Sequence, residues 1–529
     1  MTRSDVPAES AAPGPTSRRA LFTAGAAAAL TLGTVSFARA EAGSGPGGAA
    51  SGGSSVGPSG APSDASSGAP MSRTVTGTLP PGAPDFVHLP FEVPRGIREL
   101  RVSYGYARPP APPGTPGNAL DLGVFDERGT ALGGRGFRGW SGGARTEFFI
   151  RGDAATPGYL PGPVRPGTWH VALAPYTVAP EGLPYTVTIT LVPGPTAPTP
   201  RPVYPPERAA GRGRAWYRGD CHLHSVHSGG KRTPAEIAAL AREAGLDFLA
   251  TTEHNTPSSH AHWAGLGGDD LLVLTGEEVT TRNGHVLALG TAPGTHIDWR
   301  YRAGDNRFGR FAREIRRAGG LVVPAHPHAS CLGCGWQFGF AEADAVEVWN
   351  GPYTPDDEVS LQAWDKTLGA GGRWVPAMGS SDAHRDPDRV GHPQTVVLAD
   401  DLSRTAVLAG IRAGRSYVAA SSAVSLSLSV TGPRGESATL GGRLAVADDA
   451  VVTVRLSVTG AAADATTHLV TDQGTVRTGA GDGVSWVTRA SYVRYVRAEV
   501  RGAVGGQGGQ GMPGALVAFT NPVFVGVGR

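Results

Sequence analysis

Apolar runs recur along the chain between glycine, proline and polar turns, and their character differs between regions. From Thr74 to Leu191, short alternating runs such as ELRVSYGY, ALDLGVF, TWHVALA and YTVTITL are separated by Gly and Pro turns. Alternation with period two predicts strands with one buried face, and many such strands at short intervals are typical of an antiparallel β-sandwich. The pattern predicts one β-sandwich over 71–192 and a second over 421–529, where SLSLSV, VVTVRLSV, THLV and YVRAEV repeat it.

Residues 212–420 between these modules combine apolar runs with helical patterns. The segment 233–236, TPAE, has the residues of a helix start, with Thr as N-cap, Pro at the first position and Glu three residues after the cap. Gly245 marks the end of this helix, and residues 308–318 carry apolar residues at helical spacing. Strands that alternate with helices predict a mostly parallel sheet or barrel, in which catalytic residues gather at the carboxyl ends of the strands.

Histidines and carboxylates stand where these predicted strands end. The run DFLATT leads into Glu253 and His254, LVVPA leads into His326, and WVPAMGS leads into Asp382. Twelve of the fifteen histidines fall between His222 and His392. A lone histidine is more often a core or surface residue than a ligand, but imidazoles and carboxylates gathered at strand ends are what zinc, manganese or iron requires. The pattern favours a metallohydrolase that binds more than one ion.

The order of these clusters resembles a known family. DCHLHSVHSGG, TTEHNT, GEEVTTRNGH, AHPH, VEVWNGPYTPDDE and SDAHRDPDRVG follow one another as in the polymerase and histidinol phosphatase (PHP) domain, and are most similar to its exported, carbaryl-hydrolase-like (CehA/McbA-type) branch. The resemblance covers 212–420, and TNPVFV at 520–525 extends it weakly. It implies a multidomain α/β plus all-β chain, in which a distorted β/α barrel of PHP type is flanked by the two β-sandwich modules.

The resemblance also implies the metal ligands. One ion would be held by His222, His224 and Asp382, a second by His285 and His326 with Glu278 as the bridging carboxylate and Glu277 as the alternative, and a third by His254 and His384. The family commonly has Asp where this chain has Gly229. The third site therefore lacks a carboxylate unless His227 or substrate oxygens complete it. We expect two divalent ions, zinc, manganese or iron, and leave the third open.

Hydrolysis of an ester follows from such a centre, because two close cations lower the pKa of a shared water and neutralise charge on the electrophile. Glu278 and Asp382 would be catalytic through the ions. His328 or His227 would protonate the leaving group, or would only orient a ligand.

A phosphate substrate needs cationic donors near the ions. Lys231, Arg232, Arg282 and Arg385 lie beside ligand motifs, and the alternative for each is ordinary surface charge. Phosphate esters are the commonest substrates of the family, whereas the carbaryl-hydrolase branch implies carbamate or carboxyl esters. An extracellular binding protein with purely structural metals is the alternative from another class, but structural sites are usually closed four-ligand cages.

The N-terminus indicates an exported protein. Arg18-Arg19 followed by AGAAAALTLGTVSFA and Ala38-Arg39-Ala40 resembles a twin-arginine signal over 1–40, cleaved after Ala40, with an uncleaved anchor as the alternative. A flexible linker over 41–70 and a Pro-rich linker over 193–211 would separate the modules. We therefore expect an extracellular or cell-wall-associated protein. In that setting Cys331 and Cys334 form a disulfide or stay as two inert thiols, while Cys221 packs away from the ligands.

Charge limits the partners. The net charge of +2 and the lack of a basic run argue against nucleic acid. A small-molecule ester is the expected partner. After signal cleavage no segment is long and apolar enough to cross a bilayer. The β modules are substrate covers, wall-binding modules or spacers, and their sequences do not distinguish these roles.

Overall fold

The computed structural model describes residues 68–110, 115–369, 374–503 and 514–526. The predicted signal peptide over 1–40 and nearly all of the predicted linker over 41–70 lie outside these residues. No helix in the described part of the chain is long and apolar enough to cross a membrane. All of the described residues belong to one compact unit.

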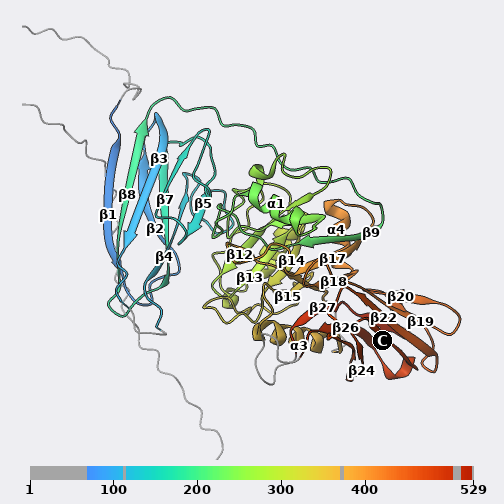
Figure 1. Ribbon diagram of the computed structural model, residues 1–529. Helices are drawn as coiled ribbons and strands as arrows, with labels where there is room; N and C mark the ends of the chain where they lie inside the picture. The colour runs from blue at the N-terminus through green and yellow to red at the C-terminus, as the bar shows by residue number, and fades with distance from the viewer. Residues whose placement is uncertain (1–67, 111–114, 370–373, 504–513, 527–529) are drawn as a thin grey trace, which may run out of the picture. The chain divides into compact units, whose positions relative to one another are not determined.

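Two antiparallel four-stranded sheets make up the N-terminal module, residues 71–193 (Figure 1). One sheet has the order β1-β8-β3-β6 and the other β2-β7-β4-β5. Leu100, Leu122 and Trp169 are fully buried in an apolar core to which both sheets contribute. The strands are β1 (Met71–Leu79), β2 (Val87–Val93), β3 (Ile97–Tyr106), β4 (Ala119–Phe125), β5 (Phe137–Gly142), β6 (Glu147–Arg151), β7 (Gly167–Thr177) and β8 (Leu183–Pro193).

The central region begins with the predicted strand–helix–strand order. β9 (Ala215–Asp220), β10 (Phe248–Thr251) and β11 (Leu272–Thr275) pair in parallel, and α1 (Pro234–Glu243) connects the first two. The Thr233 side chain caps α1 and Glu236 completes the capping box, as the sequence predicts.

The rest of the central region is not mostly parallel, which corrects the prediction. β12 (Glu277–Thr281), β13 (Gly284–Leu289) and β14 (Leu321–Ala325) form a separate antiparallel sheet. Only Arg282 and Asn283 connect β12 to β13, and a parallel pair needs a crossover of about a dozen residues or more. Within the described ranges the central strands form three sheets rather than one closed barrel. The remaining strands are β15 (Val346–Asn350) and β16 (Ala377–Ser380), which pair in parallel, and the antiparallel β17 (Gln394–Ala399) and β18 (Ser416–Ala419).

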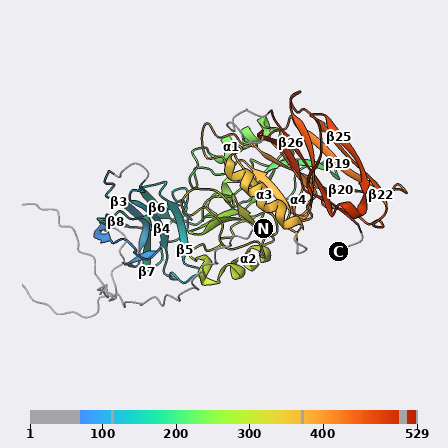
Figure 2. The same cartoon turned by 90° about the horizontal axis from the view of Figure 1, so that it is seen from below.

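Helices cover the central sheets. α2 (Phe308–Arg317) buries the apolar side chains that its sequence spacing predicts, whereas α3 (Pro355–Gly369) and α4 (Arg404–Arg412) were not predicted. Acidic residues fill the first turn of α3, where they interact favourably with the helix dipole. The helices α1, α2, α3 and α4 are labelled in Figure 2. Single 3-10 turns lie at η1 (His260–Trp263), η2 (Ala303–Asp305) and η3 (Ala490–Tyr492).

The C-terminal strands continue a central sheet. One sheet crosses the predicted domain boundary between residues 420 and 421, because β18 pairs with β27. Its strand order is β11-β10-β9-β17-β18-β27-β26-β23-β24. A second sheet, β20-β19-β22-β25, shares an apolar core with these strands. The strands are β19 (Ser425–Thr431), β20 (Ser437–Thr439), β21 (Arg443–Leu444), β22 (Val451–Thr459), β23 (Thr466–Thr471), β24 (Gly474–Ala480), β25 (Gly483–Arg489), β26 (Tyr495–Arg501), β27 (Leu516–Thr520) and β28 (Val523–Val525).

Candidate metal centre

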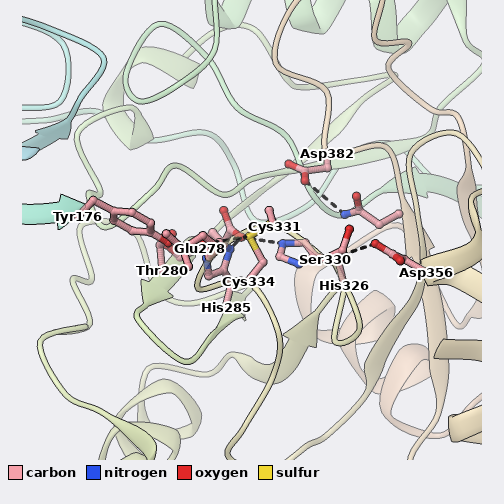
Figure 3. Close-up of a disulfide and its surroundings, with 12 residues drawn as sticks. Tyr176, Glu278, Thr280, His285, His326, Ser330, Cys331, Cys334, Asp356 and Asp382 are labelled. Atoms are coloured by element: carbon pink, nitrogen blue, oxygen red, sulfur yellow. Dashed lines mark hydrogen bonds and ion pairs between the residues drawn. A yellow bond between two sulfur atoms is a disulfide. The ribbon is translucent and has the colours of Figure 1, made fainter. Parts of the chain in front are cut away.

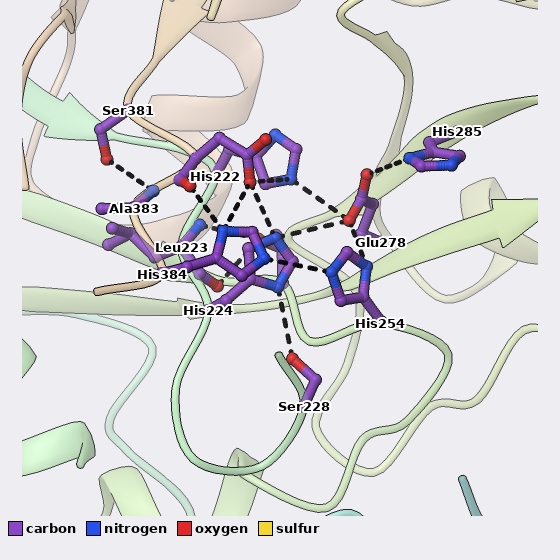
Figure 4. A network of polar contacts seen from close by, with 12 residues as sticks. His222, Leu223, His224, Ser228, His254, Glu278, His285, Ser381, Ala383 and His384 are labelled. Carbon is purple, nitrogen blue, oxygen red and sulfur yellow. Dashed lines mark hydrogen bonds and ion pairs between the residues drawn. The ribbon is translucent and has the colours of Figure 1, made fainter. Parts of the chain in front are cut away.

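The histidines and carboxylates predicted as ligands meet in one cluster (Figure 4), in which four ligands are half-buried and the others, His222, His224, Glu278 and His285, are buried. Their ligand atoms fall into three groups, and within each group all atoms lie within 4.8 Å of one another. The groups are His222, His224 and Asp382; Glu278, His285 and His326; and His224, His254 and His384. The first two groups have the composition that the family resemblance implies, and the third adds His224 to the expected pair.

His222 and His224 follow the end of β9 as alternate residues, so their side chains lie on the same side of the chain. Asp382 Oδ1 lies 3.3 Å from His222 Nε2 and 3.0 Å from His224 Nε2. Asp382 is brought to this position because Leu223 and Ala383 form a parallel bridge. One carboxylate and two imidazoles thus converge on one point.

Glu278 lies between the groups, with one oxygen facing the group to which it belongs and the other facing the remaining two. Its Oε1 atom lies 2.8 Å from His285 Nδ1 and 3.3 Å from His326 Nε2. Its Oε2 atom lies 3.4 Å from His222 Nε2 and 2.6 Å from His254 Nδ1. This is the geometry of a bridging carboxylate.

Glu277, the alternative bridging residue, faces the other side of β12. Its carboxylate contacts His296 Nδ1 at 3.2 Å and accepts the Ile297 N–H at 3.0 Å. Successive strand residues point to opposite faces, so only one of the two glutamates reaches the cluster. Of the two glutamates, Glu278 is the one that faces the cluster.

The third group lies beside Gly229. His254 Nε2 and His384 Nε2 are 3.2 Å apart, as two ligands of one ion would be. A Cβ atom added at Gly229 would lie 3.0 Å from His384 Cδ2 and 3.5 Å from His254 Cδ2. The position where the family commonly has Asp therefore adjoins this pair.

The cluster fits divalent ions. Several of its buried polar atoms have no hydrogen-bond partner among the described residues, although burying such atoms unpaired is costly. Atoms left in this way are what ions would satisfy. They include His222 Nε2, His224 Nε2 and Asp382 Oδ1, which converge on one another.

Neighbouring polar groups fix the orientation of two imidazoles. His222 Nδ1 donates to Glu347 Oε1 at 3.2 Å, which leaves Nε2 free to face the cluster. His224 Nδ1 donates to Ser228 Oγ at 3.3 Å, and Ser228 donates in turn to Glu253 Oε2 at 2.5 Å. Neither Glu347 nor Glu253 was predicted as a functional residue, although Glu347 lies in VEVWN and Glu253 in TTEHNT.

Electrostatics keep the carboxylates ionised. Burial alone would raise the pKa of Glu278, but His254, His222 and His285 outweigh it and hold that pKa well below its usual value. The pKa of Asp382 is lowered in the same way, since His222 and His224 outweigh its burial. Both groups are therefore anionic ligands at neutral pH.

Backbone strain is present at two of the ligands. His326 has φ of 29° and Asp382 has φ of 50°, a region that L-residues other than Gly rarely adopt. Such residues cluster at functional sites, where the surrounding structure holds them. The strain therefore supports a functional role for this cluster.

The two predicted proton donors lie outside the ligand groups. His227 contacts Ser258 Oγ at 3.0 Å and packs against the His262 ring, and burial lowers its pKa to about 3. It is neutral at pH 7 and is not part of the third group. His328 Nδ1 lies 3.1 Å from Ser360 Oγ, and burial lowers the pKa of His328. In each imidazole the Nδ1 atom contacts a hydroxyl, and neither histidine belongs to a ligand group, so a role as general acid stays a prediction.

The predicted cationic donors lie in different surroundings. Lys231 and Arg385 are exposed, and Arg232 forms an ion pair with Asp386 at 2.5 Å. Arg282 is different, because it lines a cavity of about 230 Å³ together with His254 and Gly229. A second cavity, of about 610 Å³, is lined by His326 and Asp382. Space for a ligand therefore adjoins the cluster on two sides.

The Cys331–Cys334 pair is a disulfide, and Cys221 is a buried free thiol (Figure 3). The loop between the bonded cysteines packs against the N-terminal module, because Tyr176 donates its hydroxyl to Leu332 O at 2.6 Å. Gly284 N, at the start of β13, donates to Gly333 O at 2.8 Å. This loop thus covers the hairpin that carries Glu278 and His285.

Comparisons with known proteins give distant resemblances. No family model matches the chain. An uncharacterised protein of Methanocaldococcus jannaschii is 26% identical over 172 residues, which cover 28% of this chain and 91% of that protein.

Among solved structures, the chain is similar to a two-domain protein of Bacteroides vulgatus described as containing a predicted PHP-like metal-dependent phosphoesterase. The identity is 15%, the match covers 61% of this chain and 99% of that chain, and the TM-score is 0.32. A putative metal-dependent phosphoesterase of Bifidobacterium adolescentis is 18% identical, covers 38% of this chain and 93% of its own, and has a TM-score of 0.23. Because these identities and TM-scores are low, the function is inferred from the geometry of the cluster.

Proposed function

We propose that this chain is a metal-dependent hydrolase of PHP type that cleaves phosphate esters. The observation that carries the proposal is the position of Glu278, whose two oxygens face different groups of imidazoles. A structural metal site is usually a closed cage of four ligands around one ion. A carboxylate shared between ligand groups, with cavities beside them, instead supports a catalytic centre with more than one ion.

Divalent ions bound here would polarise the ester and lower the pKa of a water molecule. The residues of the chain supply the rest. Asp382 and Glu278 present ionised carboxylates, Glu347 orients the His222 ring, and the burial of His222, His224 and Glu278 keeps water away from these ligands. Arg282 offers N–H donors in the cavity beside His254, where they suit the oxygens of a phosphate group.

Hydrolysis of a carbamate or carboxyl ester at the same cluster is the second candidate. It is favoured by the shortage of cations, since Lys231 and Arg385 are exposed and only Arg282 of the predicted donors lines the cavity beside His254. An uncharged ester needs fewer cationic donors than a phosphate does.

A substrate screen separates these candidates. The purified protein, loaded with zinc, manganese or iron(II), is assayed with phosphomonoesters, phosphodiesters, carbamates and carboxyl esters. The proposal expects hydrolysis of phosphate esters that a chelator abolishes and added metal restores. Metal-dependent cleavage of only carbamates or carboxyl esters would select the second candidate. Bound metal without hydrolysis of any ester would favour a binding protein.

We also propose export through the twin-arginine route, which rests on the Arg18-Arg19 pair and the apolar stretch that follows it. That route carries folded and often metal-loaded proteins, which suits a buried cluster of this kind. We further propose that the flanking β modules associate with the cell wall.

A further inference from the structure

The N-terminal module contributes side chains to the cavity beside His254. Leu120, Leu122 and Val124 of β4 point into the core of the module, so the alternate residues of this strand face the other way. On that side Phe125 and Trp140 share an apolar cluster with residues of the central region. The module is thus packed against the region that carries the ligands.

Polar contacts fix the same surface. Arg145 donates to Val226 O at 2.5 Å, close to the His222–His224 segment. Thr256 donates its hydroxyl to Gly158 O at 2.9 Å, just after His254. These bonds position the module's side chains relative to the segments that bear the ligands.

Asp121 is the carboxylate that this surface presents to the cavity. It lines the cavity with Gly229, His254 and Arg282, and no described residue donates a hydrogen bond to it. Burial raises the pKa of Asp121 to about 6, against the opposing effects of Arg282 and His254, so the carboxylate is ionised at neutral pH. An anion without a donor, inside a cavity, is a site for a cationic group of a ligand.

Arg282 acts on the pKa of Asp121 through its charge, but the described residues show no ion pair between the two. Its guanidinium lies over the Tyr176 ring at 4.2 Å, and its Nη2 atom donates to Pro175 O at 2.9 Å. These contacts hold the guanidinium in place, with its remaining donors available to an anion. Asp121 also belongs to none of the ligand groups, so its geometry favours contact with a substrate over ligation of an ion.

Aromatic side chains line the space next to this carboxylate. Phe86, Trp140 and Trp299 form an aromatic wall, in which the Trp140 and Trp299 rings lie 4.7 Å apart and Phe86 packs on both. A Cβ atom at Gly142 would lie 3.7 Å from Asp121 Oδ1 and 3.6 Å from Trp140 Nε1, so the missing side chain leaves room between them. An aromatic surface next to a carboxylate is the chemistry that recognises organic ammonium groups.

The second cavity lacks this property. The carboxylates outside the ligand groups that line it each accept a backbone N–H. Asp357 accepts the N–H of Asn350 at 2.9 Å, and Asp388 accepts that of His384 at 2.9 Å. Asp356 accepts the N–H of Ser330 at 2.8 Å. Those groups stabilise turns and the start of α3. Among the carboxylates that line either cavity and lie outside the ligand groups, Asp121 is the one for which the described residues provide no donor.

We propose that Asp121 and the aromatic wall bind an ammonium group of the substrate, so that the N-terminal module selects aminoalkyl phosphate esters for the metal centre. The choice of a phosphate ester rests on the proposed function. The ammonium group contacts Asp121, while the phosphate oxygens lie toward His254 and Arg282. The module is a specificity element and not a spacer.

Two probes of equal size test this proposal. O-Phosphoethanolamine and propyl phosphate differ only in that the first ends in an ammonium group and the second in a methyl group. Affinity for the metal-loaded full chain is measured by calorimetry, with Trp fluorescence as a second signal because Trp140 and Trp299 line the cavity. Hydrolysis is followed by phosphate release in parallel.

The parent is expected to bind O-phosphoethanolamine about tenfold or more tightly than propyl phosphate. Asp121→Asn keeps the side-chain shape and should abolish this preference without weakening propyl phosphate binding. Asp153→Asn is the matched control, since Asp153 is an exposed carboxylate of the same module that pairs with Arg151 at 2.7 Å. It should retain the preference.

Equal binding of the two probes by the parent, binding of neither, or a preference that survives Asp121→Asn would overturn the proposal. If Asp121→Asn does not fold, the ratio measured for the parent decides alone. Metal-dependent hydrolysis without preference would keep the proposed reaction and remove this inference. Selective binding without hydrolysis would keep this inference and remove the proposed reaction.

Discussion

The Nδ1 atom of His222 lies 3.2 Å from Glu347 Oε1, and this contact joins residues that are 125 positions apart in the chain. Glu347 is fully buried, and it also accepts the backbone N–H of His326 at 3.0 Å. One carboxylate therefore orients residues of two different ligand groups.

Replacing Glu347 with Ala is expected to weaken metal binding by about 10- to 100-fold, because His222 loses the partner that fixes its orientation. Metal affinity is measured by calorimetric titration of the chelator-treated protein. Glu277→Ala is the control, since Glu277 is equally buried but faces away from the cluster. An equal loss of affinity in both variants would show a general effect of removing a buried charge.

Gly229→Asp should raise the metal content of the purified protein, because its carboxylate would join His254 and His384. The new Cβ atom would come within 3.0 Å of the His384 ring, so that ring must shift by a few tenths of an ångström. Gly229→Ala introduces the crowding without the carboxylate and should leave the metal count unchanged. A count that does not rise in Gly229→Asp would argue against a third site at this pair.

Cys331→Ser, Cys334→Ser and the double variant should keep kcat near the parental value, since neither cysteine belongs to a ligand group. The thermal unfolding midpoint should fall, because closing so short a loop contributes about 2 kcal/mol to stability in the chain-entropy model. Activity is compared at a temperature well below the midpoint. A large loss of kcat in the folded variants would mean that the loop over β12 and β13 takes part in the reaction.

Replacing Arg18 and Arg19 with Lys should leave the precursor inside the cell, since the twin-arginine route requires the pair. Immunoblots of cell and culture fractions check this, with the parent and a single Arg3→Lys variant as controls. Normal secretion of the double variant would contradict export by this route.

The sequence was most informative about the ligands. His222, His224, Asp382 and Glu278 were predicted because histidines and carboxylates stand at strand ends in a recognisable order, and the structure brings them together. The start of α1 was confirmed because its capping box is a local signal.

Long-range relationships were not predictable in the same way. Asp121 and Glu347 act through contacts with residues far away in the chain, and a single carboxylate in a strand has no pattern of its own. The pairing of β18 with β27, which carries a central sheet into the C-terminal module, is likewise a non-local contact. The antiparallel β12–β13 hairpin could have been predicted, because the Asn283-Gly284 pair is a strong turn signal.

The metal content of the purified protein, measured together with hydrolysis in the parent and in Glu278→Ala, tests the central claim most directly. The parent should hold about two divalent ions per chain, since the shared carboxylate joins two ligand groups. Glu278→Ala should lose most of this metal and lower kcat by at least about 1000-fold, with an unchanged circular dichroism spectrum. A parent that takes up no metal, or a Glu278→Ala variant that keeps parental metal and parental hydrolysis, would contradict the account.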